Sequence, residues 1–404
     1  MAMMTDKVGI MTENVGDMTD KVGIYIHVPF CRSKCYYCDF CSKCGTDKDT
    51  VDAYVDAACR EIDAVAEKMR KARENESAAK NCPLPIADTV YFGGGTPTLL
   101  TPEQFERLIL AVKRNFGIAE GAEITAEANP KTADREKLAA MRRAGINRLS
   151  IGMQSVHDGE LRALGRIHNF ADFERIFADA REVGFDNISA DLMYGIPEQT
   201  AESFAESVRR IASMDPEHIS SYCLTVEEGT NFYRRRDSLS LPDEDAVASM
   251  YRKMTDILSE NGYNKYEISN FAKVGRESRH NLKYWEYDDY IGIGVAAHSF
   301  FGGVRSSHSR DIEGYIRGEN IIDDTQKIEG DEAVSEYVML AMRLSRGVDI
   351  AKFKAKFGLD FYEKFGGKIA KFSPEFIEKN AKNCKFTSEG MFVSNYILSE
   401  MLDF

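Results

Sequence analysis

Short β-rich runs alternate with helical stretches from residue 22 onward, and this alternation most narrows the folds open to the chain. Runs that favour strands lie at 22–28, 88–92, 122–127, 147–151, 186–192 and 218–224. Runs with helical periodicity lie at 50–70, 102–115, 134–144, 170–183, 201–213 and 243–261. Repeated βα units of this length predict an α/β fold whose parallel sheet has right-handed crossovers. Six units indicate an incomplete (β/α)6 barrel, with a doubly wound sheet as the alternative that periodicity does not exclude.

Residues that can bind a ligand or take part in a reaction follow the predicted strands at their C-terminal ends. The cysteines of segment 31–44 follow the first strand, Gly93–Gly95 follow the second, and Glu127 ends the third. Gln154 follows the fourth strand, and Asp191 lies at the end of the fifth. This edge of the sheet carries the functional site in barrels and in open α/β sheets alike. We therefore expect a single site at the carboxyl edge.

The chain divides into four predicted regions. Residues 1–21 hold most of three related heptapeptides, and the Gly in every unit predicts a flexible leader rather than a coiled coil. Residues 22–270 form the barrel, and residues 271–325 hold the motif HNLKYW and connecting strands. Residues 326–404 begin with an amphipathic helix at 331–344 and continue with short helical runs. They predict a small, mainly helical domain of the winged-helix kind.

Charge and composition limit the partners of the chain. Its 52 Lys and Arg against 65 Asp and Glu give a net charge of −13, which disfavours diffuse binding to nucleic acid phosphates. No run approaches the roughly 20 apolar residues of a membrane span, and the first residues lack the apolar core of a secretion signal. Five of the 9 cysteines crowd into residues 31–44, too close for several unstrained disulfides. The sequence therefore predicts a cytoplasmic protein with metal-bound thiolates.

The crowded segment CRSKCYYCDFCSKC contains Cys31, Cys35 and Cys38 in the pattern C-x3-C-x2-C. These thiols could be core residues on one helix face, but the β-rich run that leads into them argues against a helix. Cys35-x2-Cys38 and Cys41-x2-Cys44 could be zinc knuckles, but structural zinc sites usually separate such pairs by about 12 residues or more. Three thiolates can also hold three irons of a [4Fe–4S] cube and leave the fourth iron open. We favour the cluster, with Cys41 and Cys44 as spare thiols by default, or else as a redox pair or alternative ligands.

The motifs of the chain resemble those of the radical S-adenosylmethionine (SAM) superfamily, whose signature is C-x3-C-x2-C after the first strand of a βα barrel. Segments in order over residues 22–300 resemble its coproporphyrinogen III oxidase-like branch: YIHVPFC, YFGGGTPT, AEANP, SIGMQS, LGRIH and DLMYGIP. The resemblance implies a [4Fe–4S] cluster whose open iron chelates SAM. It also implies that an electron from the cluster cleaves SAM to a 5′-deoxyadenosyl radical.

The resemblance also implies which residues line the SAM site, and Tyr37 should pack near the adenine. The other implied residues are Tyr25, Gly94, Gly95, Thr96, Glu127, Gln154, Arg166 and Asp191. A carboxylate at Glu127 can hold the SAM ammonium, and glycines let backbone N–H groups approach a ligand closely. Taken alone, Gly93–Gly95 could be only a tight turn and Arg166 only a surface charge. Asp191 ends a near-apolar strand and is harder to dismiss, because buried carboxylates need partners.

Two kinds of protein in this branch are relevant. One is an oxidase that converts coproporphyrinogen III to protoporphyrinogen IX, and the other is a haem chaperone that delivers haem to respiratory enzymes. Phe40 stands where the oxidases carry a further cysteine, only thirty residues precede Cys31, and HNLKYW at 280–285 resembles a chaperone motif. The resemblance therefore implies a haem chaperone without oxidase activity. The oxidase is the alternative, and a zinc-binding structural module is a remote one.

The predicted haem site comprises His280, Asn281, Tyr284 and Trp285, with His298 as a weaker second candidate for the ligand. An imidazole beside aromatic faces has the ingredients of a haem site, although a lone histidine is more often structural. The resemblance further implies an electron donor and client haem proteins. It also allows a homodimer and peripheral contact with the inner face of the membrane.

Overall fold

The computed structural model describes residues 20–75 and 83–402, so nearly all of the predicted leader lies outside the described part of the chain. Its main element is a 12-stranded sheet, and six strands at the centre of that sheet run parallel in chain order. They are β1 (Lys21–Val28), β4 (Ile86–Gly94), β5 (Ile118–Ala128), β6 (Arg148–Gln154), β7 (Ile188–Tyr194) and β8 (His218–Cys223). Each matches a predicted strand.

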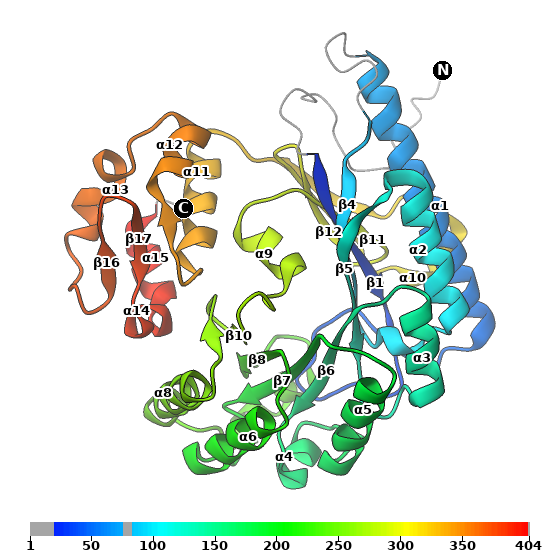
Figure 1. The fold of residues 1–404 in the computed structure, drawn as a ribbon, viewed down its shortest axis with the longest axis horizontal. Helices are drawn as coiled ribbons and strands as arrows, with labels where there is room; N and C mark the ends of the chain where they lie inside the picture. Colours follow the sequence, from blue (N-terminus) through cyan, green and yellow to red (C-terminus); the bar gives the residue numbers. More distant parts are fainter. Residues whose placement is uncertain (1–19, 76–82, 403–404) are drawn as a thin grey trace.

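The long helices after these strands lie on the outer face of the curved sheet (Figure 1). They are α1 (Lys48–Asn75), α2 (Pro102–Phe116), α3 (Arg135–Arg143), α5 (Phe170–Glu182), α6 (Ala201–Ser213) and α8 (Glu244–Glu260). A doubly wound sheet reverses its strand order and has helices on both faces. Here β1, β4, β5, β6, β7 and β8 neighbour one another in chain order. The prediction of an incomplete (β/α)6 barrel is confirmed.

Alternation along the strands separates an apolar outer face from a polar lumen, as β6 illustrates. Leu149, Ile151 and Met153 belong to the main hydrophobic core beneath the helices. Arg148 and Ser150, at the alternate positions, line a cavity inside the barrel. Successive side chains of a strand point to opposite faces, so one run supplies both the core and the site.

Local capping sets the beginnings of the helices. Thr101 Oγ1 accepts a hydrogen bond from the Gln104 backbone N–H at 3.3 Å, and Gln104 Oε1 accepts the Thr101 N–H at 2.7 Å. This capping box satisfies two donors that the first turn of α2 leaves free. Thr200 and Ser203 repeat the arrangement at the start of α6. Such signals explain why helix starts were predictable from sequence.

Further strands extend the sheet beyond the barrel on both sides. β11 (Tyr290–Ile293) pairs in parallel with β1, and β12 (His298–Phe301), β13 (Val304–His308) and β14 (Ile322–Lys327) continue antiparallel. At the other edge, β10 (Asn270–Ala272) pairs with β8, and β9 (Asn264–Lys265) pairs with β10. The connecting strands after the barrel therefore prolong its sheet. Shorter elements are β2 (Phe30–Cys31), β3 (Lys43–Cys44), α4 (Asp158–Ala163), α7 (Asn231–Arg234), α9 (Arg279–Trp285), α10 (Ile312–Arg317) and the 3-10 turns Pro97–Leu99 and Arg236–Ser238.

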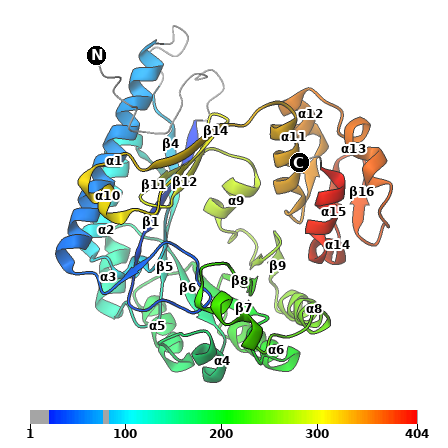
Figure 2. The ribbon, with the colours of Figure 1, turned by 180° about the vertical axis from the view of Figure 1, so that it is seen from behind.

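The C-terminal part has its own core and lies beside the open side of the barrel (Figure 2). Its helices are α11 (Gly330–Met342), α12 (Ile350–Phe357), α13 (Phe361–Ile369), α14 (Ser388–Phe392) and α15 (Ser394–Met401). A small antiparallel sheet joins β15 (Val348–Asp349), β17 (Asn383–Phe386) and β16 (Ile377–Lys379) in that order. Phe353, Phe361 and Met401 are fully buried at its centre. This unit agrees with the predicted small, mainly helical domain, while the predicted boundaries at residues 21, 270 and 325 stay predictions.

Candidate functional site

A cavity of about 620 Å³ opens at the carboxyl ends of the barrel strands. The predicted site residues that line it are Cys31, Cys35, Tyr37, Cys38, Gly94, Gly95, Thr96, Glu127, Gln154, Arg166, Asp191 and Asn281. Tyr25, His280, Tyr284 and Trp285 were also predicted but are not among the lining residues. The structure thus places the predicted cluster and SAM residues around one cavity, except for Tyr25, whose hydroxyl contacts His27. It leaves most of the predicted haem residues outside that space.

The cysteine loop runs from the end of β1 to the start of α1 and is anchored by a buried histidine. His27 is 4% exposed, and its Nε2 lies 2.9 Å from the carbonyl oxygen of Cys41. With Nε2 donating to that carbonyl, Nδ1 can accept the Tyr25 hydroxyl, which lies 3.1 Å away. Burial lowers the pKa of His27, so the ring stays neutral in this role. Sequence reasoning missed His27, although it lies inside the quoted segment YIHVPFC.

A chain of hydrogen bonds links two of the three cysteines across the cavity rim. Cys31 Sγ lies 3.5 Å from Thr96 Oγ1, which accepts a hydrogen bond from Asn129 Nδ2 at 2.8 Å. Arg166 donates to Asn129 Oδ1 through Nη2 and reaches Cys35 Sγ through Nη1 at 3.5 Å. Donors and positive charge beside sulfur favour the thiolate, which is the metal-binding form of cysteine. Asn129 was not predicted, although it stands in the segment AEANP.

Glu127 presents a carboxylate to the cavity from the end of β5. Its oxygens accept the Tyr91 hydroxyl at 2.9 Å and the Gly94 N–H at 3.1 Å. Burial raises the pKa of Glu127 to about 7, and Asp191 adds to the rise, while the two hydrogen bonds oppose it. Gly94 has φ +107°, and a Cβ there would lie 2.5 Å from the His27 ring. Only glycine therefore brings this N–H to the carboxylate.

Asp191 is held by hydroxyl groups from its own strand, β7, and from the neighbouring strand β6. Ser150 Oγ lies 2.9 and 3.0 Å from its two oxygens, and Ser189 Oγ lies 3.0 Å from one of them. Burial raises the pKa of Asp191, while hydrogen bonds, including one from Ser220, and the charge of Arg148 oppose the rise. Arg148 is 1% exposed and lines the same cavity, and its Nε has no hydrogen-bond partner among the described residues. No sequence motif pointed to Arg148, because its place in the lumen depends on strand orientation.

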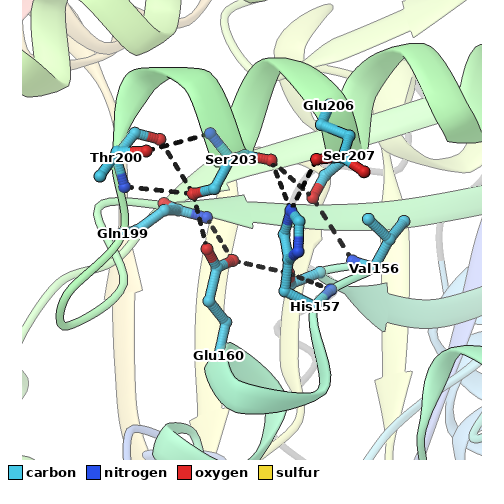
Figure 3. Close-up of polar contacts among 9 residues, drawn as sticks. Val156, His157, Glu160, Gln199, Thr200, Ser203, Glu206 and Ser207 are labelled. Atoms are coloured by element: carbon cyan, nitrogen blue, oxygen red, sulfur yellow. Dashed lines mark hydrogen bonds and ion pairs between the residues drawn. The ribbon is translucent and has the colours of Figure 1, made fainter.

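Gln154 ends β6 with φ +63°, a left-handed conformation that side chains rarely adopt, and its buried Oε1 is unpaired within the described chain. The turn after it is held by Glu160 of α4 (Figure 3). The Glu160 carboxylate accepts hydrogen bonds from Ser155 Oγ at 2.6 Å, Gln199 Nε2 at 2.9 Å and Ser203 Oγ at 2.7 Å. Backbone strain of this kind persists only where the surroundings hold it. The network thus holds the turn that follows Gln154, a residue of the cavity lining.

The motif HNLKYW forms α9, and its histidine is enclosed by the barrel. His280 is 1% exposed, with Nδ1 2.7 Å from Thr89 Oγ1 and Nε2 2.8 Å from the Tyr284 hydroxyl. Burial lowers the pKa of His280 to about 3. Trp285 lies apart from this pair, with the Arg343 guanidinium 6.0 Å from its ring centre. Ligation of haem iron by His280 would require a hydrogen bond to break, so this arrangement favours the structural role.

We therefore expect His280→Ala to lower the thermal stability of the protein. The substitution leaves the Thr89 and Tyr284 hydroxyls buried without their partner and opens a small cavity. The expected cost is roughly 2–4 kcal/mol. Thermal unfolding followed by circular dichroism measures it, with His298→Ala as the control because His298 is exposed. An unchanged melting temperature in His280→Ala would contradict the structural role.

The arrangement of the thiols suits a cluster. The described residues contain no group of three His, Cys, Asp or Glu side chains placed to hold a single metal ion. A cubane needs a different geometry, since each thiolate binds a separate iron. Cys31, Cys35 and Cys38 share one cavity rim, and donors reach two of their sulfurs. These residues fit a [4Fe–4S] cluster, and the unpaired Gln154 Oε1 and the Glu127 carboxylate fit a polar cationic ligand beside it.

Comparisons with known proteins identify the family of the chain. The family model of the radical SAM superfamily matches residues 25–211, and that of the HemN C-terminal domain matches residues 328–393. The chain is 34% identical to the heme chaperone HemW of Bacillus subtilis over 94% of this chain and 98% of that protein. It is 35% identical to the heme chaperone HemW of Synechocystis over 93% of this chain and 95% of that protein.

A solved structure has the same fold. The radical SAM coproporphyrinogen III oxidase (HemN) of Escherichia coli superposes with a TM-score of 0.78 at 23% identity, covering 95% of this chain and 91% of that one. At this identity the likeness supports the fold alone. The relatives of higher identity cover nearly the whole chain and decide the family. The chain belongs to the radical SAM superfamily and, within it, to the family of heme chaperones named HemW.

Proposed function

We propose that the protein binds haem and passes it to client haem proteins, using a [4Fe–4S] cluster and SAM bound at the barrel cavity. The observation that carries the proposal is the convergence of Cys31, Cys35 and Cys38 with Glu127 and Asp191 on one cavity. Membership of the HemW family supports the haem-related role. When bound, the cluster supplies single electrons and an open iron for SAM.

The residues of the chain have separate tasks in this proposal. The three thiolates hold the cluster, and Thr96 and Arg166 stabilise the charge on the sulfurs. Glu127 holds the SAM ammonium, and Asp191, kept in place by the serine hydroxyls, binds polar groups deeper in the cavity. Tyr37 lines the cavity next to Cys38 and is available to an adenine ring. Gly94, Gly95 and Thr96 line the same cavity and offer their backbone groups to the ligand.

The proposed haem site is separate from the cavity. Of the described residues that line the cavity, Asn281 is the member of HNLKYW that reaches it, and none is a histidine. His298, the second candidate, is exposed at the start of β12. We therefore propose that haem binds outside the cavity. Asn281, which lines the cavity, is assigned to the SAM site instead. Tyr284 and Trp285 remain proposed as aromatic contacts.

Haem and porphyrinogen assays separate the chaperone from the oxidase. We expect haem to give a Soret band, and we expect no conversion of coproporphyrinogen III by cluster-replete protein with SAM and reductant. Phe40 is 61% exposed and lines the cavity. By the resemblance it stands where the oxidases carry an additional cysteine, and a phenyl ring offers no thiol there. Spectra of His280→Ala and His298→Ala identify the ligand, since loss of the band without loss of stability marks direct ligation. Formation of protoporphyrinogen IX at enzymatic rates would overturn the assignment.

Partners and location follow from the same proposal. Among the described residues no helix is long and apolar enough to cross a membrane. We propose a cytoplasmic protein that meets respiratory clients at the inner face of the membrane, receives electrons from a separate donor and forms a homodimer. The net charge of the chain, −13, disfavours nucleic acid as a partner.

A further inference from the structure

The two cysteines of segment 31–44 that lie outside the proposed ligand set, Cys41 and Cys44, occupy different environments. Cys41 is 9% exposed, and its Sγ lies 3.7 Å from the Arg310 carbonyl oxygen, so it behaves as a packed residue. Cys44 is exposed and belongs to β3. That strand pairs in parallel with β2, and the register places Cys44 directly opposite Cys31. A spare thiol therefore lies beside one of the three cluster cysteines.

This register meets the distance requirement for a disulfide. Paired strands lie about 4.8 Å apart, and disulfides form where the Cα atoms are about 4.4–6.8 Å apart. Directly opposed residues present their side chains on the same face of the pair. Gly45 follows Cys44 with φ +70° and open space around it, so the end of β3 can adjust. No rearrangement of the barrel is needed.

Cys44 does not line the cavity where SAM would bind, whereas Cys31 does. A thiol at this position is therefore poorly placed to become a fourth ligand at the open iron. It is well placed to react with Cys31 once the cluster has been lost. Cys31 is only partly exposed, so the exposed Cys44 is the thiol that a soluble oxidant meets first.

We propose that Cys44 is a modification site that forms a reversible disulfide with Cys31 in the cluster-free protein. The Cys44 thiolate attacks a low-molecular-weight disulfide, forms a mixed disulfide and releases one small thiol. The Cys31 thiolate then attacks the Cys44 sulfur and releases the second small thiol. Two protein thiols are oxidised by two electrons, and the small disulfide is reduced to two thiols. The bond removes one cluster ligand and protects it from irreversible over-oxidation.

Peptide mapping tests the bond directly. Cluster-free protein is treated with glutathione disulfide, alkylated and digested with trypsin without reduction. Cleavage at Arg32 and Lys43 separates Cys31 in residues 22–32 from Cys44 in residues 44–48, away from the other cysteines of the loop. We expect these two peptides to be linked in the wild-type protein and in Cys41→Ser, and to be unlinked in Cys44→Ser. A bond from Cys31 to Cys35 or Cys38, or Cys44 left as a mixed disulfide with glutathione, would overturn the proposal.

Cluster assembly tests the consequence, which rests on the proposed role of Cys31 as a ligand. Oxidised wild-type protein and Cys41→Ser should take up iron and sulfide only after treatment with a dithiol, whereas oxidised Cys44→Ser should take them up at once. Equal uptake of iron and sulfide by oxidised wild type and oxidised Cys44→Ser would refute the proposal that the disulfide controls cluster assembly. A mapped disulfide in protein that assembles no cluster under any condition would instead refute the proposed function.

Discussion

Replacing Cys31, Cys35 and Cys38 together by alanine should remove the brown chromophore and the iron of anaerobically purified protein. These thiolates supply the protein ligands of the proposed cube, and a cluster without them has nothing to hold it. The expected change is from about four irons per chain to almost none. Iron and acid-labile sulfide analysis together with the visible spectrum measure it.

The control variants for this experiment are Cys41→Ala and Cys44→Ala, whose thiols do not line the cavity. Both should retain the full iron content when purified anaerobically. Loss of iron in either one would show that the cluster uses a different set of cysteines. Stoichiometric zinc without iron in the wild-type protein would contradict the cluster itself.

SAM affinity should depend on pH because of Glu127. Burial raises the pKa of this carboxyl to about 7, and the charged form is the one that attracts the SAM ammonium. About a tenth of a group with that pKa is ionised at pH 6 and about nine-tenths at pH 8. Affinity should therefore rise roughly tenfold from pH 6 to pH 8 and level off above it. The change that SAM causes in the EPR spectrum of the reduced cluster, titrated at each pH, gives the dissociation constant.

The matched variants are Glu127→Gln and Glu206→Gln. Glu127→Gln should bind SAM more weakly at pH 8 and lose this pH dependence, so any dependence that persists belongs to SAM's own amine. Glu206 is 61% exposed on α6, and its substitution should leave the wild-type profile unchanged. An EPR spectrum indifferent to saturating SAM, or a Glu127→Gln profile identical to that of the wild type, would show that the SAM site is elsewhere.

The barrel elements were predictable because their signals are local. The run 201–213 is helix α6 at the same residues, and the run 170–183 differs from α5 by one residue at its end. Capping residues and a period of 3.6 lie within a few residues of each helix, so they can be read without the fold. The pairing of β11 with β1 joins residues more than 260 positions apart, and no local pattern contains that information.

The residues of the candidate site also divide into those that local motifs predict and those that only the fold reveals. Residues that belong to contiguous motifs, such as Gly94, Glu127 and Arg166, were predicted and do line the cavity. His280 was predicted from its motif, but its Nδ1 partner, Thr89, lies 191 positions away. Whether a histidine nitrogen is free for a metal depends on such distant partners. Arg148 was missed for the same reason, since only the completed barrel encloses it.

The sequence by itself determined the succession of βα units, the C-x3-C-x2-C spacing of three cysteines and the presence of carboxylates and glycines at strand ends. These features depend on neighbours within one motif and on the period of each element. Only the tertiary structure decided that the strands form an open barrel, that His280 is already bonded through both nitrogens, and that Cys44 faces Cys31. Those outcomes depend on which distant strands pair and in which register, because burial and hydrogen bonding arise only when the segments have come together.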